Sequence, residues 1–193
     1  MIVVVRHGRT LSNASGLLLG RADPSLDDVG RSQARQVAAA VGKVDRVVTS
    51  PLARARQTAA EFDLAGGQVE IDKRFIELDY GEWDERPVSD VTSAEWARWR
   101  ADIGWAPPGG ESLAALGERV RSGLDELVSA AEVGTVVVVT HVSPVKAALA
   151  WALGVGDEVS WRSFVQPASI TRIGILRGVP QLLAFNDVAH CGP

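Results

Sequence analysis

Short apolar runs rich in β-branched residues constrain the fold of this chain more than any other feature. The run 2–5 reads Ile-Val-Val-Val, the run 135–140 reads Thr-Val-Val-Val-Val-Thr, and a third strand-like run covers 44–49. Runs of this length and composition predict buried β-strands. Between them lie segments such as 27–41, whose apolar residues recur at helical spacing. Strands that alternate with helices predict a mostly parallel sheet covered by helices on both faces.

The full set of predicted elements forms an α/β fold, a three-layer α/β/α sandwich. We expect further helices over 51–61, 113–131 and 144–153, a short strand over 69–71, and a closing hairpin that joins 169–176 to 181–185. Ser50 suits an N-cap, and Pro51 suits the first position of the helix that follows. No linker divides the sequence, so residues 1–193 are expected to form a single domain.

Residues 80–111 differ from the rest because they combine four tryptophans with the run Pro107-Pro108-Gly109-Gly110. A segment of this length exceeds a simple connection between elements. We interpret it as an insertion that forms a lid, with one short helix over about 93–101. Packing of the four aromatic side chains into a core would also account for this composition, and the two interpretations are compatible.

Charged residues and histidines follow the predicted strands where each strand ends. Arg6 and His7 follow the first run, and His141 follows the run 135–140. Arg54 lies in the first turn of the helix after 44–49, and helical side chains lean toward the helix N-terminus, so Arg54 should reach the same edge. Ligands bind at the carboxyl ends of strands in open α/β sheets. These residues could bind or attack a phosphate there, although each could also be an ordinary surface residue.

Composition argues against several classes of partner. The net charge is −4 and no basic block is present, which argues against nucleic acid and against an anionic membrane surface. No apolar run approaches the roughly 20 residues of a membrane span, and residues 1–6 do not resemble a signal peptide. Cys191 is the only cysteine, so it forms no internal disulfide, and we expect an exposed thiol in the tail. These features predict a cytoplasmic protein, and they are compatible with a homodimer.

Five ordered motifs resemble those of the histidine phosphatase superfamily, the phosphoglycerate-mutase-like enzymes. The segment 6–13 reads RHGRTLSN and is similar to the signature Arg-His-Gly-x-Thr-x-x-Asn, and 50–59 reads SPLARARQTA and is similar to the second motif. The segment ELDYGEW at 77–83 resembles the family's acid segment, and PGGES at 108–112 and TH at 140–141 complete the set. The matches follow the family's order over nearly the whole chain.

The resemblance implies a role for each matching residue. His7 is expected to be the nucleophile that becomes phosphohistidine, Arg6, Arg54 and His141 to form the phosphate pocket, and Glu77 to donate the proton. Further substrate contacts are expected from the matching positions Gly8, Asn13, Gly20 and Val142. The family needs no metal, and the resemblance therefore implies an enzyme without cofactors.

One departure from the family pattern lies at Val142-Ser143-Pro144, because many members have two glycines after the histidine. The backbone N–H of Val142 could still face a phosphate, but the β-branched side chain would change the shape of the pocket. We expect the pocket to remain catalytic.

The chemistry implied is hydrolysis of a small phosphomonoester. Two guanidiniums and a protonated His141 would spread the charge of the phosphate. Glu77 would protonate the leaving alkoxide if burial or the incoming phosphate raised its pKa. Without the resemblance, Glu77 is one of several acids in its segment.

Two other activities remain as alternatives at this point. One is a phosphoglycerate mutase of the same fold, and the other is a non-catalytic binding protein that keeps the fold. The segment 80–111 offers only Arg86, Arg98 and Arg100 as cations. A mutase needs fixed cations around its substrate, so this segment favours hydrolysis.

Overall fold

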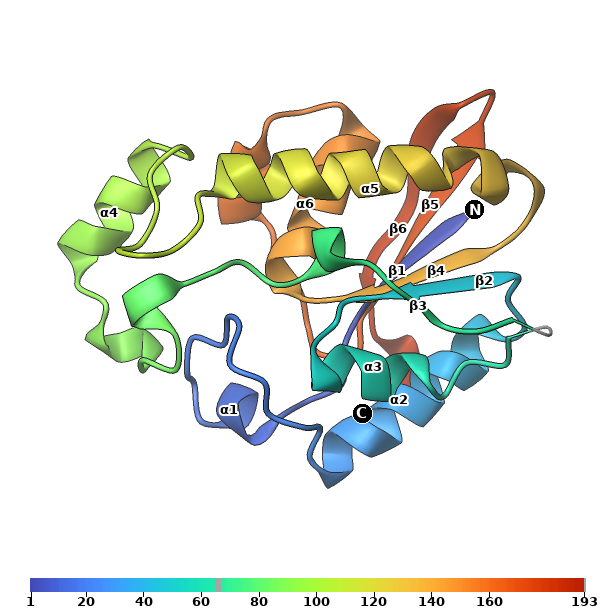
Figure 1. Ribbon diagram of the computed structural model, residues 1–193, viewed down its shortest axis with the longest axis horizontal. Helices are drawn as coiled ribbons and strands as arrows, with labels where there is room; N and C mark the ends of the chain where they lie inside the picture. The colour runs from blue at the N-terminus through green and yellow to red at the C-terminus, as the bar shows by residue number, and fades with distance from the viewer. Residues whose placement is uncertain (65–66, 193) are drawn as a thin grey trace.

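The strands form one mixed sheet, in a computed structural model that describes residues 1–64 and 67–192 (Figure 1). Within these residues the sheet has six strands in the order β3-β2-β4-β1-β5-β6. The strands are β1 (Ile2–Arg6), β2 (Arg46–Thr49), β3 (Glu70–Ile71), β4 (Val136–Thr140), β5 (Ile170–Leu176) and β6 (Val179–Asp187). The pairs β3-β2, β2-β4 and β4-β1 are parallel, whereas β5 and β6 join the sheet antiparallel. The predicted mostly parallel sheet is confirmed.

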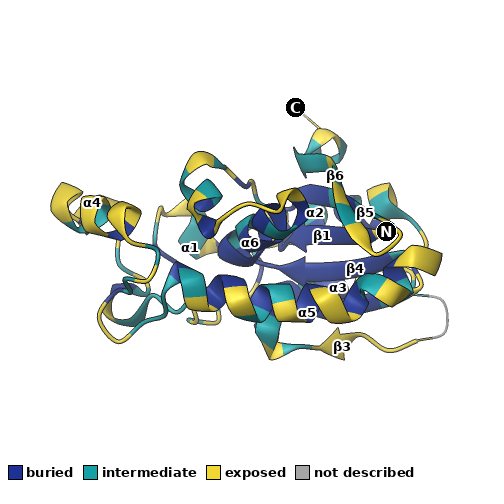
Figure 2. Ribbon diagram, turned by 90° about the horizontal axis from the view of Figure 1, so that it is seen from above, coloured by how far each residue is buried: buried dark blue, intermediate teal, exposed yellow. Residues whose placement is uncertain are grey.

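Helices cover both faces of this sheet (Figure 1). They are α2 (Asp28–Val41) and α3 (Ala53–Ala59) on one face, and α5 (Leu113–Val133) and α6 (Val142–Leu153) on the other. Side chains of β1 alternate between the two, because Ile2 and Val4 pack in the core beside α5 and α6, and Val3 and Val5 pack beside α2 and α3. The central strands are buried (Figure 2). The three-layer sandwich predicted from the sequence is confirmed.

Three parallel strands end side by side, and this determines where the polar residues after them lie. β1 and β4 end in register, and the last residue of β2 pairs with Val139 of β4. His7, Ser50 and His141 directly follow these strands, so all three start from one edge of the sheet. Helices α3 and α6 also begin at this edge, with their N-terminal turns over it.

The segment 80–111 carries α4 (Ser93–Ala101), which projects beyond the end of the sheet and is largely exposed (Figures 1 and 2). Thr92 and Glu95 cap it through a reciprocal capping box. Trp83 and Trp99 are buried, and their ring centroids lie 5.7 Å apart in an edge-to-face arrangement. The predicted helix and the packing of the aromatic rings are confirmed. A movement of this segment as a lid stays a prediction.

Four local predictions are wrong. Helix α3 begins at Ala53 rather than at Pro51, and Leu52 is an N-cap without a side-chain bond. Ser50 is therefore not the N-cap of α3, and its hydroxyl lies 2.7 Å from Nε2 of His141 and accepts from the N–H of Leu52 at 3.3 Å. The second strand begins at Arg46, two residues later than predicted. Cys191 is partly buried against the core beside α2, and this burial raises the pKa of its thiol.

The closing hairpin is confirmed with a tighter turn than expected. Arg177 and Gly178 have φ angles of 52° and 76°. Two successive residues with positive φ are what a two-residue type I′ turn requires. For this reason β6 starts at Val179, before the predicted start at 181.

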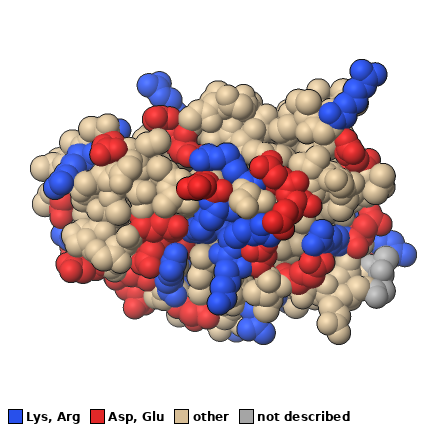
Figure 3. Space-filling model, turned by 45° about the horizontal axis from the view of Figure 1, so that its top comes forward, with Lys and Arg blue, Asp and Glu red and all other residues tan. Residues whose placement is uncertain are grey.

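Charged side chains of both signs are interleaved on the face of the molecule seen in Figure 3. Arg74 pairs with Asp72 and Glu126, and Arg46 pairs with Glu70.

In the described residues, no helix is both long enough and apolar enough to cross a membrane.

Candidate active site

His7 has a fixed orientation at the edge of the sheet. Its Nδ1 lies 2.7 Å from the carbonyl oxygen of Gly8, which can only accept, so Nδ1 carries the proton. Nε2 is then the acceptor, and the Nε of Arg54 donates to it at 3.2 Å. Burial, followed by the charges of Arg54 and Arg6, lowers the pKa of His7. The imidazole is therefore neutral, with a lone pair on Nε2 that can act as a nucleophile.

Arg54 is fully buried and held by backbone oxygens rather than by a carboxylate. Its two terminal nitrogens each donate at 2.7 Å, one to the carbonyl of Ala22 and one to the carbonyl of Gly20. In the described part of the chain, no carboxylate oxygen lies within 4.0 Å of its guanidinium. The positive charge is therefore not neutralised by an ion pair, which makes the position favourable for an anion.

Arg6 adds a second buried guanidinium beside the same edge. Its Nη1 donates to the carbonyl of Val165 at 2.7 Å, while its Nε is buried without a hydrogen-bond partner. Burial, together with a smaller effect of Arg54, lowers the pKa of Arg6 to about 10, although Glu77 opposes this change. An anion bound between the two guanidiniums would stabilise both positive charges.

His141 lies across from His7, with 5.0 Å between the two ring centroids. Its Nε2 is 2.7 Å from the hydroxyl oxygen of Ser50, and its Nδ1 is buried without a partner. Burial lowers the pKa of His141, and His7 and Arg54 lower it further. The free protein therefore favours a neutral His141, and protonation of His141 against a bound phosphate stays a prediction. A bound phosphate dianion would raise this pKa again.

Glu77 is buried against the N-terminal turn of α6. Its Oε1 accepts from the N–H of Leu78 at 2.7 Å, and its Oε2 accepts from the N–H of Val142 at 3.0 Å. The N–H of Ser143 reaches both oxygens, at 3.2 and 3.4 Å. Burial raises the pKa of Glu77 more than these N–H groups and Arg54 lower it. The raised pKa expected from the sequence is present, and its main cause is desolvation.

Four expected substrate contacts are engaged within the protein. The N–H of Val142 binds Glu77 instead of facing open space, the N–H of Gly8 donates to the Thr58 hydroxyl at 3.1 Å, and the Oδ1 of Asn13 accepts within a capping box at the start of α1 (Leu11–Ala14). Gly20 uses its carbonyl to hold Arg54 and its N–H to bind Asp84. Their expected direct contacts with substrate stay predictions.

Gly8 has a separate structural reason to be glycine. A Cβ at this position would lie 2.3 Å from the carbonyl oxygen of Gly30 in α2. The loop after β1 can pack this closely against the helix only without a side chain.

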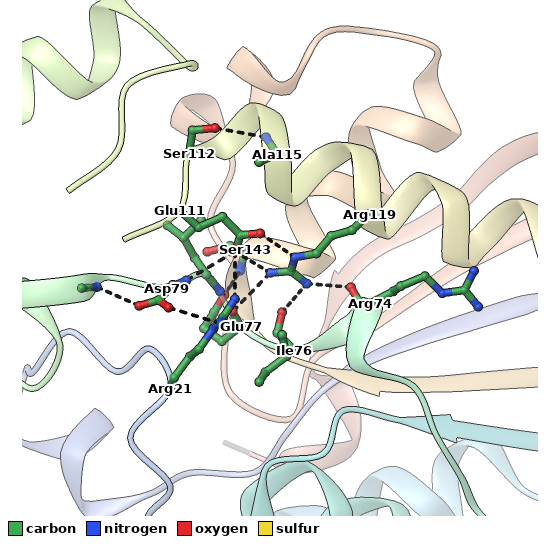
Figure 4. A network of polar contacts seen from close by, with 12 residues as sticks. Arg21, Arg74, Ile76, Glu77, Asp79, Glu111, Ser112, Ala115, Arg119 and Ser143 are labelled. Carbon is green, nitrogen blue, oxygen red and sulfur yellow. Dashed lines mark hydrogen bonds and ion pairs between the residues drawn. The ribbon is translucent and has the colours of Figure 1, made fainter. Parts of the chain in front are cut away.

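A network that the sequence did not indicate holds the acid segment in place (Figure 4). Arg119 of α5 donates to the carbonyls of Ile76 and Glu77 at 2.7 and 3.2 Å. Its Nε and Nη2 also bind the carboxylate of Glu111 at 2.7 and 2.8 Å, which accepts from Arg21 as well. Arg119 therefore joins the backbone around Glu77 to the end of the segment 80–111 and to the loop that holds Arg54.

Asp84 is a second supporting residue that the sequence did not indicate. Its carboxylate accepts from the backbone N–H groups of Gly20, Arg21 and Ala22, at 2.7 to 2.8 Å. The carbonyls of Gly20 and Ala22 are the two that bind Arg54. Asp84 thus positions Arg54 through the loop.

Across residues 1–64 and 67–192, no three His, Cys, Asp or Glu side chains cluster in a way that could hold a metal ion. The site consists of two neutral imidazoles, two guanidiniums and one carboxyl with a raised pKa. Such a set can bind a phosphate and transfer both a phosphoryl group and a proton.

Comparison with known proteins agrees with the geometry of the site. The family model of the histidine phosphatase superfamily (branch 1) matches residues 2–188. The chain belongs to this superfamily.

Two curated relatives differ in length and in name. The bifunctional protein Rv2228c of Mycobacterium tuberculosis is 36% identical over an alignment of 180 residues, which covers 88% of this chain and 49% of that protein. The chain therefore spans about half the length of this relative. A Yersinia enterocolitica protein named "Probable phosphoglycerate mutase GpmB" is 33% identical, over 89% of this chain and 83% of its own.

A solved structure of similar extent is that of the mycobacterial glucosyl-3-phosphoglycerate phosphatase Rv2419c in complex with VO3. It has a TM-score of 0.85 and 28% identity to this chain, and the alignment covers 97% of this chain and 98% of that one. Among its homologues the chain therefore has phosphatases as well as a named mutase.

Proposed function

We propose that this protein hydrolyses small phosphomonoesters through a phosphohistidine formed on Nε2 of His7. The observation that carries the proposal is the fixed tautomer of His7, whose nucleophilic nitrogen points at the guanidinium of Arg54. Family membership and the phosphatase names among the homologues support hydrolysis. The substrate is a small phosphorylated metabolite, and the cytoplasmic location expected from the sequence stays a prediction.

The proposed reaction divides the work among five side chains. Arg6, Arg54 and His141 bind the phosphate oxygens, which neutralises the charge that would repel the nucleophile. His7 Nε2 attacks phosphorus, the bond from phosphorus to the ester oxygen breaks, and Glu77 donates a proton to that oxygen. A water molecule then attacks the phosphohistidine and gives a proton to Glu77, which releases phosphate and restores the free enzyme.

The test is phosphate release across a panel of phosphorylated metabolites, with His7→Ala as the inactive variant. We expect turnover of at least one small monoester by the wild-type protein and none by the variant, with both proteins folded by circular dichroism. The control is the histidine variant His190→Ala, because His190 is only partly buried, bonds only the carbonyl of Ala168 and lies outside the site. Turnover by His7→Ala would refute the proposal.

Mutase activity is the second candidate, because a relative carries that name and phosphohistidine can pass its phosphoryl group to another oxygen of the substrate. The assay offers 3-phosphoglycerate with catalytic 2,3-bisphosphoglycerate and compares 2-phosphoglycerate formed with phosphate released. We expect phosphate to exceed the isomer. Isomer in about tenfold excess, a preference of about 1.4 kcal/mol between the two barriers, would establish a mutase.

A further inference from the structure

A small cavity lies beside α6, next to the carboxyl of Glu77 but outside the phosphate pocket. Its volume is about 140 Å³, and the rings of Tyr80, Trp96, Trp99 and Trp161 form much of its wall. The remaining lining comes from Leu78, Leu113, Val142, Ser143, Lys146 and Ser160. Aromatic rings can pack against the organic part of a ligand. They do not account for the lysine that lies among them.

Three side chains that line this cavity have hydrogen-bond donors left without an acceptor or a counter-ion. Lys146 is partly buried, and its ammonium donates to the carbonyl of Ser160 at 2.9 Å. Within the described residues no carboxylate oxygen lies within 4.0 Å of this ammonium. The indole nitrogens of Trp99 and Trp161 are buried without any hydrogen-bond partner. Buried polar groups in proteins are nearly always paired, and an ammonium has three protons to donate. The cavity therefore combines an ammonium that has no carboxylate partner with two indole N–H groups that have no acceptor.

The cavity is next to the group that would protonate the leaving oxygen. Val142 and Ser143, whose N–H groups bind Glu77, lie on α6 one turn before Lys146, and both also line the cavity. Leu78 directly follows Glu77 in the chain, and Tyr80 lies two residues further on. A phosphomonoester with its phosphate near His7 and its ester oxygen near Glu77 would direct its organic part toward this cavity.

We propose that this cavity binds a carboxylate on the leaving group, so that the substrates are phosphomonoesters of small hydroxy acids and Lys146 determines this specificity. The inference rests on the proposed phosphatase function. A carboxylate supplies two acceptor oxygens and the negative charge that Lys146 lacks, and the indole N–H groups of Trp99 and Trp161 are further donors for it. Pockets for larger ligands measure about 300 Å³ or more, so this cavity fits a short acid rather than a nucleoside.

The direct test compares two esters that differ at one carbon, 3-phosphoglycerate and glycerol 3-phosphate. The measured quantity is the ratio of their kcat/KM values for phosphate release. We expect the wild-type protein to favour the acid by tenfold or more. Lys146→Met should lower this ratio at least tenfold, because methionine fills the same space without a charge. The kcat/KM value for glycerol 3-phosphate should stay within threefold of the wild-type value. Trp161→Phe, which keeps a ring and removes the N–H, should lower the ratio by a smaller factor.

The matched control is Lys43→Met, which changes an exposed lysine distant in sequence from the cavity. Its ratio should equal that of the wild-type protein. Equal losses on both esters in Lys146→Met would mean that Lys146 only supports the structure, and this would overturn the proposal. A wild-type ratio near one would overturn it as well, while leaving hydrolysis itself in place.

A binding experiment separates failure of this inference from failure of the proposed function. Tryptophan fluorescence of His7→Ala is titrated with each ester, since this variant binds without turnover. We expect a Kd at least tenfold lower for 3-phosphoglycerate than for glycerol 3-phosphate, and equal Kd values once Lys146→Met is added. Equal Kd values before that change would overturn the subsite even if no ester is hydrolysed. Loss of turnover on all esters with the Kd difference intact would refute the function alone.

Discussion

Replacing Glu77 with glutamine should separate proton donation from the binding of phosphate. Glutamine cannot protonate the leaving oxygen, so an alkyl phosphate, whose alkoxide is a strong base, should lose much of its rate. General acid catalysis contributes a factor of about 10² to 10⁴, which corresponds to about 2.7 to 5.4 kcal/mol in the barrier. A nitrophenolate leaves without being protonated, so the kcat/KM value for 4-nitrophenyl phosphate should fall by less than about tenfold.

The surroundings of Glu77 also predict a loss of stability. The carboxylate accepts from the N–H groups of Leu78, Val142 and Ser143. A carboxamide keeps one acceptor oxygen but has an NH₂ group in place of the second oxygen. At least one buried backbone N–H therefore loses its acceptor. The expected cost is about 1 to 3 kcal/mol in the free energy of unfolding. This cost applies equally to both substrates, so it cancels in their ratio.

The assay measures kcat/KM for glycerol 3-phosphate and for 4-nitrophenyl phosphate, below the melting temperature of the variant. Glu82→Gln is the control, because Glu82 lies exposed in the same segment. We expect the alkyl-to-aryl ratio to fall at least tenfold in Glu77→Gln and to stay unchanged in Glu82→Gln. Equal losses on the two substrates would show that Glu77 does not protonate the leaving group.

Three further predictions follow from the site. Arg54→Lys should lower kcat/KM by about 100-fold or more, because a single ammonium cannot replace the several charge-assisted bonds that the guanidinium makes to the backbone and the phosphate. Arg56→Lys, on the exposed side of α3, should have little effect on kcat/KM. Equal effects of the two changes would exclude Arg54 from the pocket. EDTA should leave activity unchanged, and activity that is lost in EDTA and restored by a divalent ion would contradict the metal-free reaction. His141 has a pKa below that of an unfolded histidine, about 6.5, so the unfolded chain binds more protons below that pH and stability falls as pH decreases. The slope approaches about 1.4 kcal/mol per pH unit for this histidine, and urea unfolding of His141→Gln should show a shallower decrease between pH 6.5 and 5; an identical slope would refute the lowered pKa.

The edge of the sheet could be predicted from the sequence because short-range patterns determine it. Valine-rich runs define β1 and β4, and the residues directly after a strand must lie at its end. The spacing of Leu116, Val120, Leu124 and Leu127 likewise defines the buried face of α5. Local sequence patterns were therefore enough to predict that His7, His141 and the two arginines lie at this edge.

The partners of these residues could not be predicted in the same way, because they depend on contacts between distant segments. Asp84 binds three N–H groups more than 60 positions away in the chain. The sequence around Arg119 does not distinguish it from other helical arginines, and its role depends on the position of α5 over the acid segment. Val142 was expected to offer its N–H to a ligand, but Glu77, 65 positions earlier, accepts it. The protonation of His141 depends on burial, which the sequence does not determine.

The most direct measurement of the central claim is the site of phosphorylation during turnover. The protein is mixed with a phosphomonoester labelled with ³²P and quenched within milliseconds in base, because phosphohistidine survives base and is lost in acid. Peptide mapping should place the label on His7, and His7→Ala should carry none. Label on Ser50, on Cys191 or on a carboxylate would contradict the account.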